Sequence, residues 1–247
     1  MCLFSVFLLG PLVLVVVFSV NANEMIAFPM GGLSLRWYED LLNNPEFYSS
    51  FKNALTIAIP VAIISAVTGT SLVYAVTTLR IRGGNTLLGL ISLPVLLPPL
   101  IIAISLVVFY VRLAHIPLGL HATISGHVVI TQPFVIAVMM ARMASFDFTV
   151  LDAARDLGAT AFQAFMKVTL PQIRTAIIGA ALIAFALSLD EFIITVFTIS
   201  GGNTLSTFVW GKLKTSLDPS MNAIATVILV ITVTLTLISL RLSRYRG

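Results

Sequence analysis

Two adjacent carboxylates, Asp190 and Glu191, interrupt an apolar run over residues 175–199. A charge at the centre of a membrane helix costs roughly 2.5–3.5 kcal/mol on insertion scales, so neither side chain should face lipid while ionised. A helix over this run would carry the pair about 24 Å along its axis, and adjacent residues would point about 100° apart. One carboxylate could therefore face a central cavity and hold a cation. The alternative is a solvated pair, with Glu191 bound to Lys212 or Lys214.

A second concentration of charge lies at 151–171, with Asp152, Arg155, Asp156 and Lys167 in an otherwise apolar neighbourhood. Apolar residues recur there at steps of three and four, which predicts one helical face: Leu151, Ala154, Leu157, Ala161, Phe162, Phe165, Met166 and Leu170. Gly158 can adopt the left-handed conformation that ends one short helix, and Pro171 is expected to end the next. Periodicity alone leaves two interpretations open, a segment lying on lipid headgroups and a surface for a soluble partner.

The composition is that of a membrane protein, so the elements that position these residues should be membrane helices. Of 247 residues, 58% are hydrophobic and only 10% charged, against about 25% charged residues in soluble domains. The net charge of +4 does not indicate nucleic acid, because the basic residues cluster at the ends of apolar runs, as membrane topology dictates. One cysteine excludes an internal disulfide and a cysteine metal cluster. The three histidines lack an acidic neighbour, so we expect no metal site.

Apolar runs long enough to cross a bilayer predict an all-α protein with six membrane spans in a single domain over 1–247. The expected spans are 2–20, 53–79, 86–111, 120–141, 175–199 and 219–240, with a loop at 142–174. The first run lacks a basic n-region and exceeds 15 residues, which favours a retained span over a signal peptide. Prolines at 94, 98 and 99 should break the third span, which would help to shape a path.

The distribution of Lys and Arg orients these spans. Nine basic residues fall on the side of the chain termini and the 142–174 loop, and five on the other. By the positive-inside rule, both termini and the loop are cytosolic. Residues 22–50 then lie outside, where their aromatic side chains suit an interfacial helix, and the Asp190–Glu191 pair lies toward the outer side.

Fixed points in the charged hairpin resemble a known motif. The spacing matches that of the EAA loop of ABC-transporter permeases. The matching residues are Asp152-Ala153-Ala154, then Gly158 after three residues, then Val168-Thr169-Leu170-Pro171 after nine more, with Asp replacing Glu and Val replacing Ile. The resemblance implies the type I ABC importer fold. It further implies that Asp152, Ala153, Ala154, Gly158, Leu170 and Pro171 form coupling helices that dock on an ATP-binding subunit.

The chain contains no G-x-x-x-x-G-K-[ST] phosphate loop. We therefore expect no enzymatic activity and no cofactor bound by this chain, with ATP and magnesium held by a partner. The resemblance implies a second permease subunit, which we expect to be a related but different chain, two ATP-binding subunits and an extracytoplasmic solute-binding protein. The lipid bilayer of the cell inner membrane surrounds the assembly.

Other stretches resemble spermidine/putrescine permeases, notably 35–38, 187–192 and 218–226. The resemblance implies a polyamine importer and places Asp190 in the substrate path, with Glu191 beside it. Tyr110 and Trp210 are further candidates, because their rings could make cation–π contacts, although aromatics near span ends more often belong to the interfacial belt. An importer of another small solute (an organophosphonate, iron or an amino-acid derivative) is the alternative. A channel or passive carrier is a more distant one.

Overall fold

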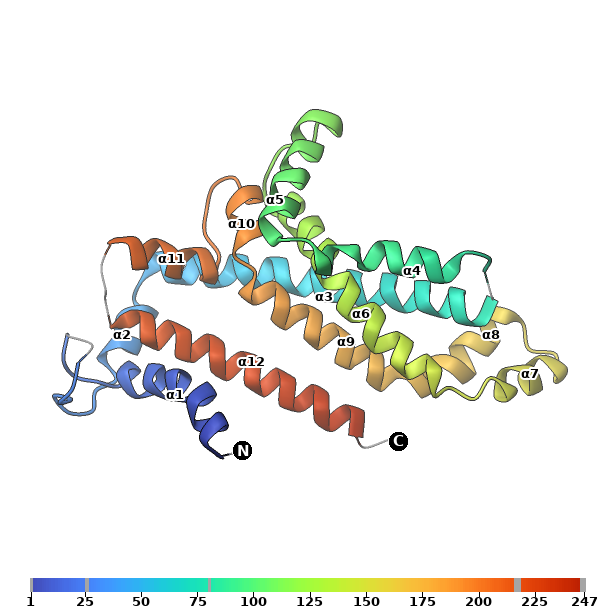
Figure 1. Cartoon of the computed structure of the whole chain (residues 1–247), viewed down its shortest axis with the longest axis horizontal. Coiled ribbons are helices and arrows are strands. Elements are labelled where there is room, and N and C mark those ends of the chain that lie inside the picture. The colour runs from blue at the N-terminus through green and yellow to red at the C-terminus, as the bar shows by residue number, and fades with distance from the viewer. Residues whose placement is uncertain (1, 25–26, 80, 216–218, 245–247) are drawn as a thin grey trace. The chain divides into compact units, whose positions relative to one another are not determined.

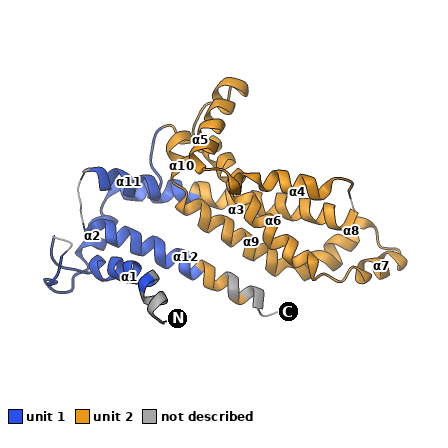
Figure 2. Ribbon diagram, viewed as in Figure 1, with its two compact units in different colours: residues 1–55, 201–234 blue, residues 56–200, 235–247 orange. Residues whose placement is uncertain are grey.

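The computed structural model describes residues 2–24, 27–79, 81–215 and 219–244, and the described chain is almost entirely helical. An isolated antiparallel bridge joins Asn21 and Leu33. The chain divides into two compact units, which Figure 2 distinguishes by colour. Unit 1 comprises residues 1–55 and 201–234, and unit 2 comprises residues 56–200 and 235–247.

Figure 1 labels the α-helices in chain order. The helical segments are α1 (Cys2–Ser19), α2 (Arg36–Leu42), α3 (Pro45–Leu79), α4 (Gly84–Ser92), the 3-10 turn η1 (Leu93–Leu96), α5 (Pro99–Val108), the π-helical turn η2 (Phe109–Leu113), α6 (Leu120–Ala144), α7 (Thr149–Asp156), α8 (Ala161–Ala164), the π-helical turn η3 (Phe165–Thr169), α9 (Leu170–Asp190), α10 (Ile193–Thr198), α11 (Leu205–Thr215) and α12 (Ser220–Arg244).

Four helical stretches of the described chain are long and apolar enough to cross a membrane: Pro45–Leu79, Leu120–Ala144, Ala161–Asp190 and Ser220–Ile238. A fifth would combine Gly84–Leu96 with Pro99–Leu113, which meet at an angle of 109°. The described apolar part of α1, Leu9–Ser19, is shorter. Six spans are compatible with this pattern, and the number stays a prediction.

The third predicted span, 86–111, is broken where its prolines lie. Leu97 is extended, with ψ of 144°, and α5 restarts at Pro98–Pro99, where the proline ring is tolerated in the first helical turn. The residue before a proline is pushed toward extended conformations, which accounts for the break at Leu97. The structure therefore confirms that the prolines interrupt this span.

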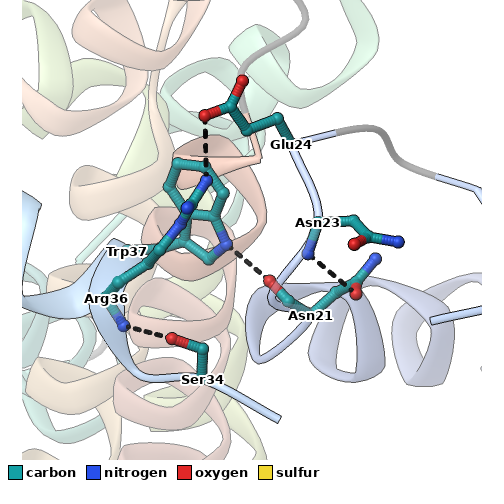
Figure 3. Close-up of polar contacts among 6 residues, drawn as sticks. All are labelled: Asn21, Asn23, Glu24, Ser34, Arg36 and Trp37. Carbon is teal, nitrogen blue, oxygen red and sulfur yellow. Dashed lines mark hydrogen bonds and ion pairs between the residues drawn. The ribbon is translucent and has the colours of Figure 1, made fainter. Parts of the chain in front are cut away.

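Unit 1 contains a folded segment between α1 and α2, within the 22–50 stretch whose aromatics suit an interfacial helix. The Trp37 indole donates to the carbonyl of Asn21 at 2.7 Å (Figure 3). The Asn21 side chain accepts from the backbone of Asn23 at 3.2 Å. Arg36 lies over the Trp37 ring at 4.0 Å and pairs with Glu24 at 3.3 Å. Trp37 is buried, so it packs inside the unit because the chain reverses around it.

An extended apolar core of unit 2 is shared by α3, α4, α6, α7, α8 and α9. Its buried members are Val73, Val76, Leu88, Val135, Ile136, Met139, Met143, Phe146, Leu151, Ala164, Ile173, Ala180 and Ala184. α6 packs along α9, while α10 packs against α5 and α6. Small residues permit close approach of helices in membranes, and a Cβ at Gly69 would lie 2.6 Å from the Val135 side chain.

Candidate functional site

The first candidate site is the charged hairpin, which begins with α7. Asp152 and Ala153 are exposed on this helix, and Ala154 is half-buried. Asp152 pairs with Arg155 at 3.8 Å across one helical turn, and an exposed pair of this kind contributes little stability. The polar atoms of α7 therefore remain available to a partner.

Gly158 ends α7 in the manner that the sequence predicts. Its φ is 86°, in the left-handed region that glycine adopts without steric cost. The Gly158 N–H donates to Arg155 at 2.8 Å, and the Ala159 N–H donates to Ala154 at 3.0 Å. These two bonds are those of a Schellman C-cap. The spacing from the Asp152-Ala153-Ala154 triplet to Gly158 thus fixes where the helix stops, and the left-handed prediction is confirmed.

The second half of the hairpin starts with a capping box. Thr160 accepts from the Gln163 N–H at 3.2 Å, and Gln163 accepts in return from the Thr160 N–H at 3.0 Å. The chain then stays helical through η3 into α9, where Pro171 occupies the first turn. The prediction that Pro171 ends a helix is wrong, because the helical stretch continues from Ala161 to Asp190 and Pro171 follows the π-helical turn η3, where the regular helical hydrogen-bond pattern is already interrupted.

The eight apolar residues of the hairpin do not form a single face, since the turn at Gly158 interrupts the helical period. Leu151 is 1% exposed and lies in the unit 2 core. In contrast, Leu157, Phe162 and Met166 are 89%, 72% and 43% exposed. One set anchors the hairpin, and the other presents apolar surface. We call Leu157, Phe162 and Met166 the apolar tip.

The second candidate site is the break between α9 and α10. Asp190 is the last residue of α9 and is exposed, and within the described chain its side chain forms no hydrogen bond or ion pair. Glu191 is half-buried and extended, with ψ of 116°. Its carboxylate accepts from the Ile194 N–H at 2.9 Å. The two carboxylates therefore differ, because Glu191 is engaged with the start of α10 whereas Asp190 is presented outward.

The expected fifth span, 175–199, is thus two helices with a bend at 191–192. Sequence reasoning did not find what holds this bend. His127, on α6, is 1% exposed and contacts both sides of it. Its Nδ1 lies 2.8 Å from the hydroxyl of Ser188 on α9, and its Nε2 lies 2.9 Å from the hydroxyl of Thr195 on α10.

The two aromatic candidates lie in different units. Tyr110, in η2 of unit 2, is 5% exposed, and its hydroxyl lies 2.8 Å from that of Ser125. Trp210, on α11 of unit 1, is 46% exposed, and the Lys214 ammonium lies 5.3 Å from its ring centroid. A lysine therefore already faces the Trp210 ring, and the Tyr110 ring is enclosed by protein. Their roles in a substrate path stay predictions.

Comparison with solved structures defines the class of protein. The fold matches a chain of a bacterial alginate ABC transporter in complex with an alginate pentasaccharide-bound periplasmic protein (TM-score 0.76, 18% identity), covering 98% of this chain and 90% of that one. It also matches a chain of the MetNI methionine ABC transporter (TM-score 0.53, 20% identity), covering 85% and 94%. The fold is that of an ABC transporter permease.

Sequence comparison then identifies the family. Residues 58–245 match the model of the binding-protein-dependent transport system inner membrane component. The chain is 35% identical over 230 residues to the putrescine transport system permease protein PotI of Escherichia coli K12, covering 90% of this chain and 82% of that protein. It is 28% identical over 235 residues to the spermidine/putrescine permease PotC of the same strain, covering 95% and 88%. The chain belongs to this family of inner-membrane transport components.

Proposed function

We propose that this chain is a permease subunit of an ATP-driven importer for putrescine, spermidine or both. The observation that carries the proposal is its 35% identity to a putrescine permease over 90% of the chain. The exposed Asp190 carboxylate supports it, because an ammonium group of a polyamine is the kind of ligand that a carboxylate binds. A half-buried Glu191, already engaged with α10, would contribute less to the contact.

The proposed complex contains a second permease, two ATP-binding subunits and an extracytoplasmic solute-binding protein, with both termini of this chain in the cytosol. The apolar tip supports docking on a soluble subunit, since its three large apolar side chains are exposed close together in the sequence and exposed apolar surface marks interaction sites. Leu151, buried in the unit 2 core, would transmit movement from the docked subunit to the spans. ATP and magnesium would be bound by the partner, and Asp152, Ala153, Ala154, Gly158, Leu170 and Pro171 would make the coupling contact.

In the proposed mechanism, closure of the ATP-binding subunits moves the hairpin, and the spans change from inward-open to outward-open. The solute-binding protein then releases its ligand toward Asp190. A single exposed carboxylate would hold a cation weakly, and weak binding permits release on the other side. Tyr110 would join this path only after the contacts that enclose it rearrange, and Trp210 only after Lys214 leaves its ring.

The test is ATP-dependent uptake of labelled putrescine and spermidine into proteoliposomes that contain the whole complex and its receptor. Wild type is compared with Asp190→Asn, which removes the charge and keeps the shape. We expect polyamine uptake that falls about tenfold or more in the variant, as loss of a charge-assisted hydrogen bond implies, with ATP hydrolysis intact. An active ATPase without polyamine uptake in the wild type would refute the substrate assignment, and would favour another solute.

A further inference from the structure

We infer that His127 is the positioning residue of the α9–α10 break: it holds Ser188 and Thr195 together and so fixes the direction in which the two carboxylates point. The inference deepens the proposed function and rests on it, because the carboxylates matter only if a cation passes them. It concerns a residue that neither the charge pattern nor the coupling motif identifies.

The hydrogen bonds around the imidazole assign its tautomer. The Thr195 hydroxyl donates its one proton to the Glu191 carbonyl at 2.8 Å, so toward His127 it can only accept. Nε2 therefore carries the imidazole proton and donates to Thr195. In the neutral ring, Nδ1 is then an acceptor, and the Ser188 hydroxyl donates to it. A neutral imidazole thus satisfies both hydroxyls.

These bonds reach the carboxylates on both sides of the bend. Ser188 lies two residues before Asp190 on α9, so its bond to Nδ1 fixes the last turn of that helix. Thr195 links Nε2 to the Glu191 carbonyl, and the Glu191 carboxylate binds the adjacent Ile194 N–H. The bend is therefore tied to α6 at its start and at its end through one side chain.

α10 packs along the face of α6 that carries His127. The Gly119 N–H donates to the Thr198 carbonyl at 2.8 Å, and the hydroxyls of Thr198 and Thr123 lie 3.0 Å apart. A Cβ at Gly126 would lie 2.8 Å from the Ile194 Cγ2. Residues 119, 123, 126 and 127 share one helical face, so α10 is seated on α6, with His127 at the position that also reaches α9.

Loss of His127 would leave both hydroxyls without this partner in a buried site, where an unmet polar group is costly. The chain offers a matched control in His121, one and a half turns away on the same helix. His121 is exposed and bonds only the Pro117 carbonyl at 2.8 Å among the described contacts. A comparison of His127→Ala with His121→Ala therefore separates the bridge from a general effect of removing a histidine.

The first measurement reports the position of α10 without substrate. The chain has a single cysteine, Cys2, so Cys2→Ser removes the background and Val196→Cys places a reporter on α10, at a residue that is 47% exposed. In the assembled complex we expect the maleimide labelling rate of this reporter to change several-fold with His127→Ala and to stay unchanged with His121→Ala. Equal labelling rates in the reporter chain with His127→Ala, with His121→Ala and with neither change would overturn the inference.

The second measurement is polyamine uptake in the same complexes. We expect His127→Ala to lose roughly tenfold, the size that one unsatisfied buried polar group implies, with the ATP-binding subunit still bound and active. His127→Gln, which can still donate to Thr195, should recover part of the uptake. Combining His127→Ala with Asp190→Asn should cost little more than Asp190→Asn alone, since both changes act on one contact. Additive losses, or complexes that fail to assemble with both Ala and Gln, would indicate a merely structural histidine.

The two proposals fail separately. Normal uptake by Asp190→Asn would refute the substrate contact, whatever the labelling shows. An unchanged labelling rate in His127→Ala beside a defective Asp190→Asn would refute the positioning role and leave the substrate contact standing.

Discussion

The coupling hairpin and the α9–α10 break both place charged residues in an apolar chain, yet the fold supports them in opposite ways. The turns of the hairpin are formed by contacts within about ten residues, such as the Gly158 cap and the Thr160 capping box, and Leu151 anchors it in the unit 2 core. The break is held by a histidine 61 and 68 positions away from its two partners. One site is local and exposed, and the other is assembled from three helices and buried. Damage to each should therefore produce a different defect.

The largest effect is expected at the hairpin turn. Gly158→Val forces a β-branched residue to a φ of 86°, at a strain of about 1–3 kcal/mol, and the strain can be relieved only by losing the cap. We expect the ATP-binding subunit to be lost on purification, and uptake with it. Gly89→Val, on α4, is the control, because no atom lies within 4 Å of a Cβ there. A Gly158→Val complex that keeps its ATPase would contradict the docking proposal.

The next effect should appear at the break, with the opposite signature. A side chain at Gly126 collides with Ile194, and overpacking of this kind costs typically about 1–3 kcal/mol. Gly126→Ala should reduce uptake, and Gly126→Val should reduce it further, while the ATP-binding subunit stays bound and hydrolyses ATP. Loss of subunit binding in this series would show that the two sites are not separable.

The same contrast explains what the sequence could reveal. The spacing of Asp152, Gly158 and Pro171 is visible directly in the sequence, so the hairpin and its turn were predictable. The break at the prolines of the third span was also predictable, because proline acts on its neighbour. The role of His127 was not, since its partners lie on other helices and its spacing from the other histidines carries no period.

Two hairpin predictions were wrong for a related reason. The apolar period at 151–170 suggested a single face, but the left-handed turn at Gly158 resets the helical direction. Leu151 consequently turns to the core, and Leu157 to solvent. Pro171 suggested a helix end, yet it falls in a first turn. A pattern counted along the chain assumes one continuous helix, and this count ran through the turn that Gly158 itself predicts.

The apolar tip gives a smaller and more graded test of the hairpin. Phe162→Ser removes a ring that is 72% exposed, so the isolated chain should unfold at an unchanged temperature. Binding of the ATP-binding subunit should weaken about tenfold or more, because burying such a side chain is worth about 1.5–3 kcal/mol and about 1.4 kcal/mol is a factor of ten. Leu42→Ser, at a residue 79% exposed on α2 in the other unit, should bind as wild type does. Equal binding by all three chains would remove the tip from the interface.

The smallest effect is a pH dependence at the start of α7. The Asp147 carboxylate accepts from the Thr149 hydroxyl at 2.7 Å and from the Thr149 N–H at 3.0 Å, and these bonds lower the pKa of Asp147 below its ordinary value. A carboxyl with a lowered folded-state pKa stabilises the fold above its unfolded pKa, and loses this contribution as the pH falls through the folded pKa.

Asp147→Asn should therefore increase amide exchange in 148–156 slightly at neutral pH. The difference from wild type should persist down to the ordinary carboxyl pKa, and should vanish only as the pH falls below it and through the lowered folded-state pKa of Asp147. The effect is small because the carboxyl is fully exposed and solvent screens it. Asp40→Asn, at an exposed position on α2, serves as the control and should leave exchange in 148–156 unchanged at every pH. A difference that persisted at low pH would show that the Asp147 charge does not order α7. The order of the hairpin would then come from Gly158, Thr160 and the buried Leu151.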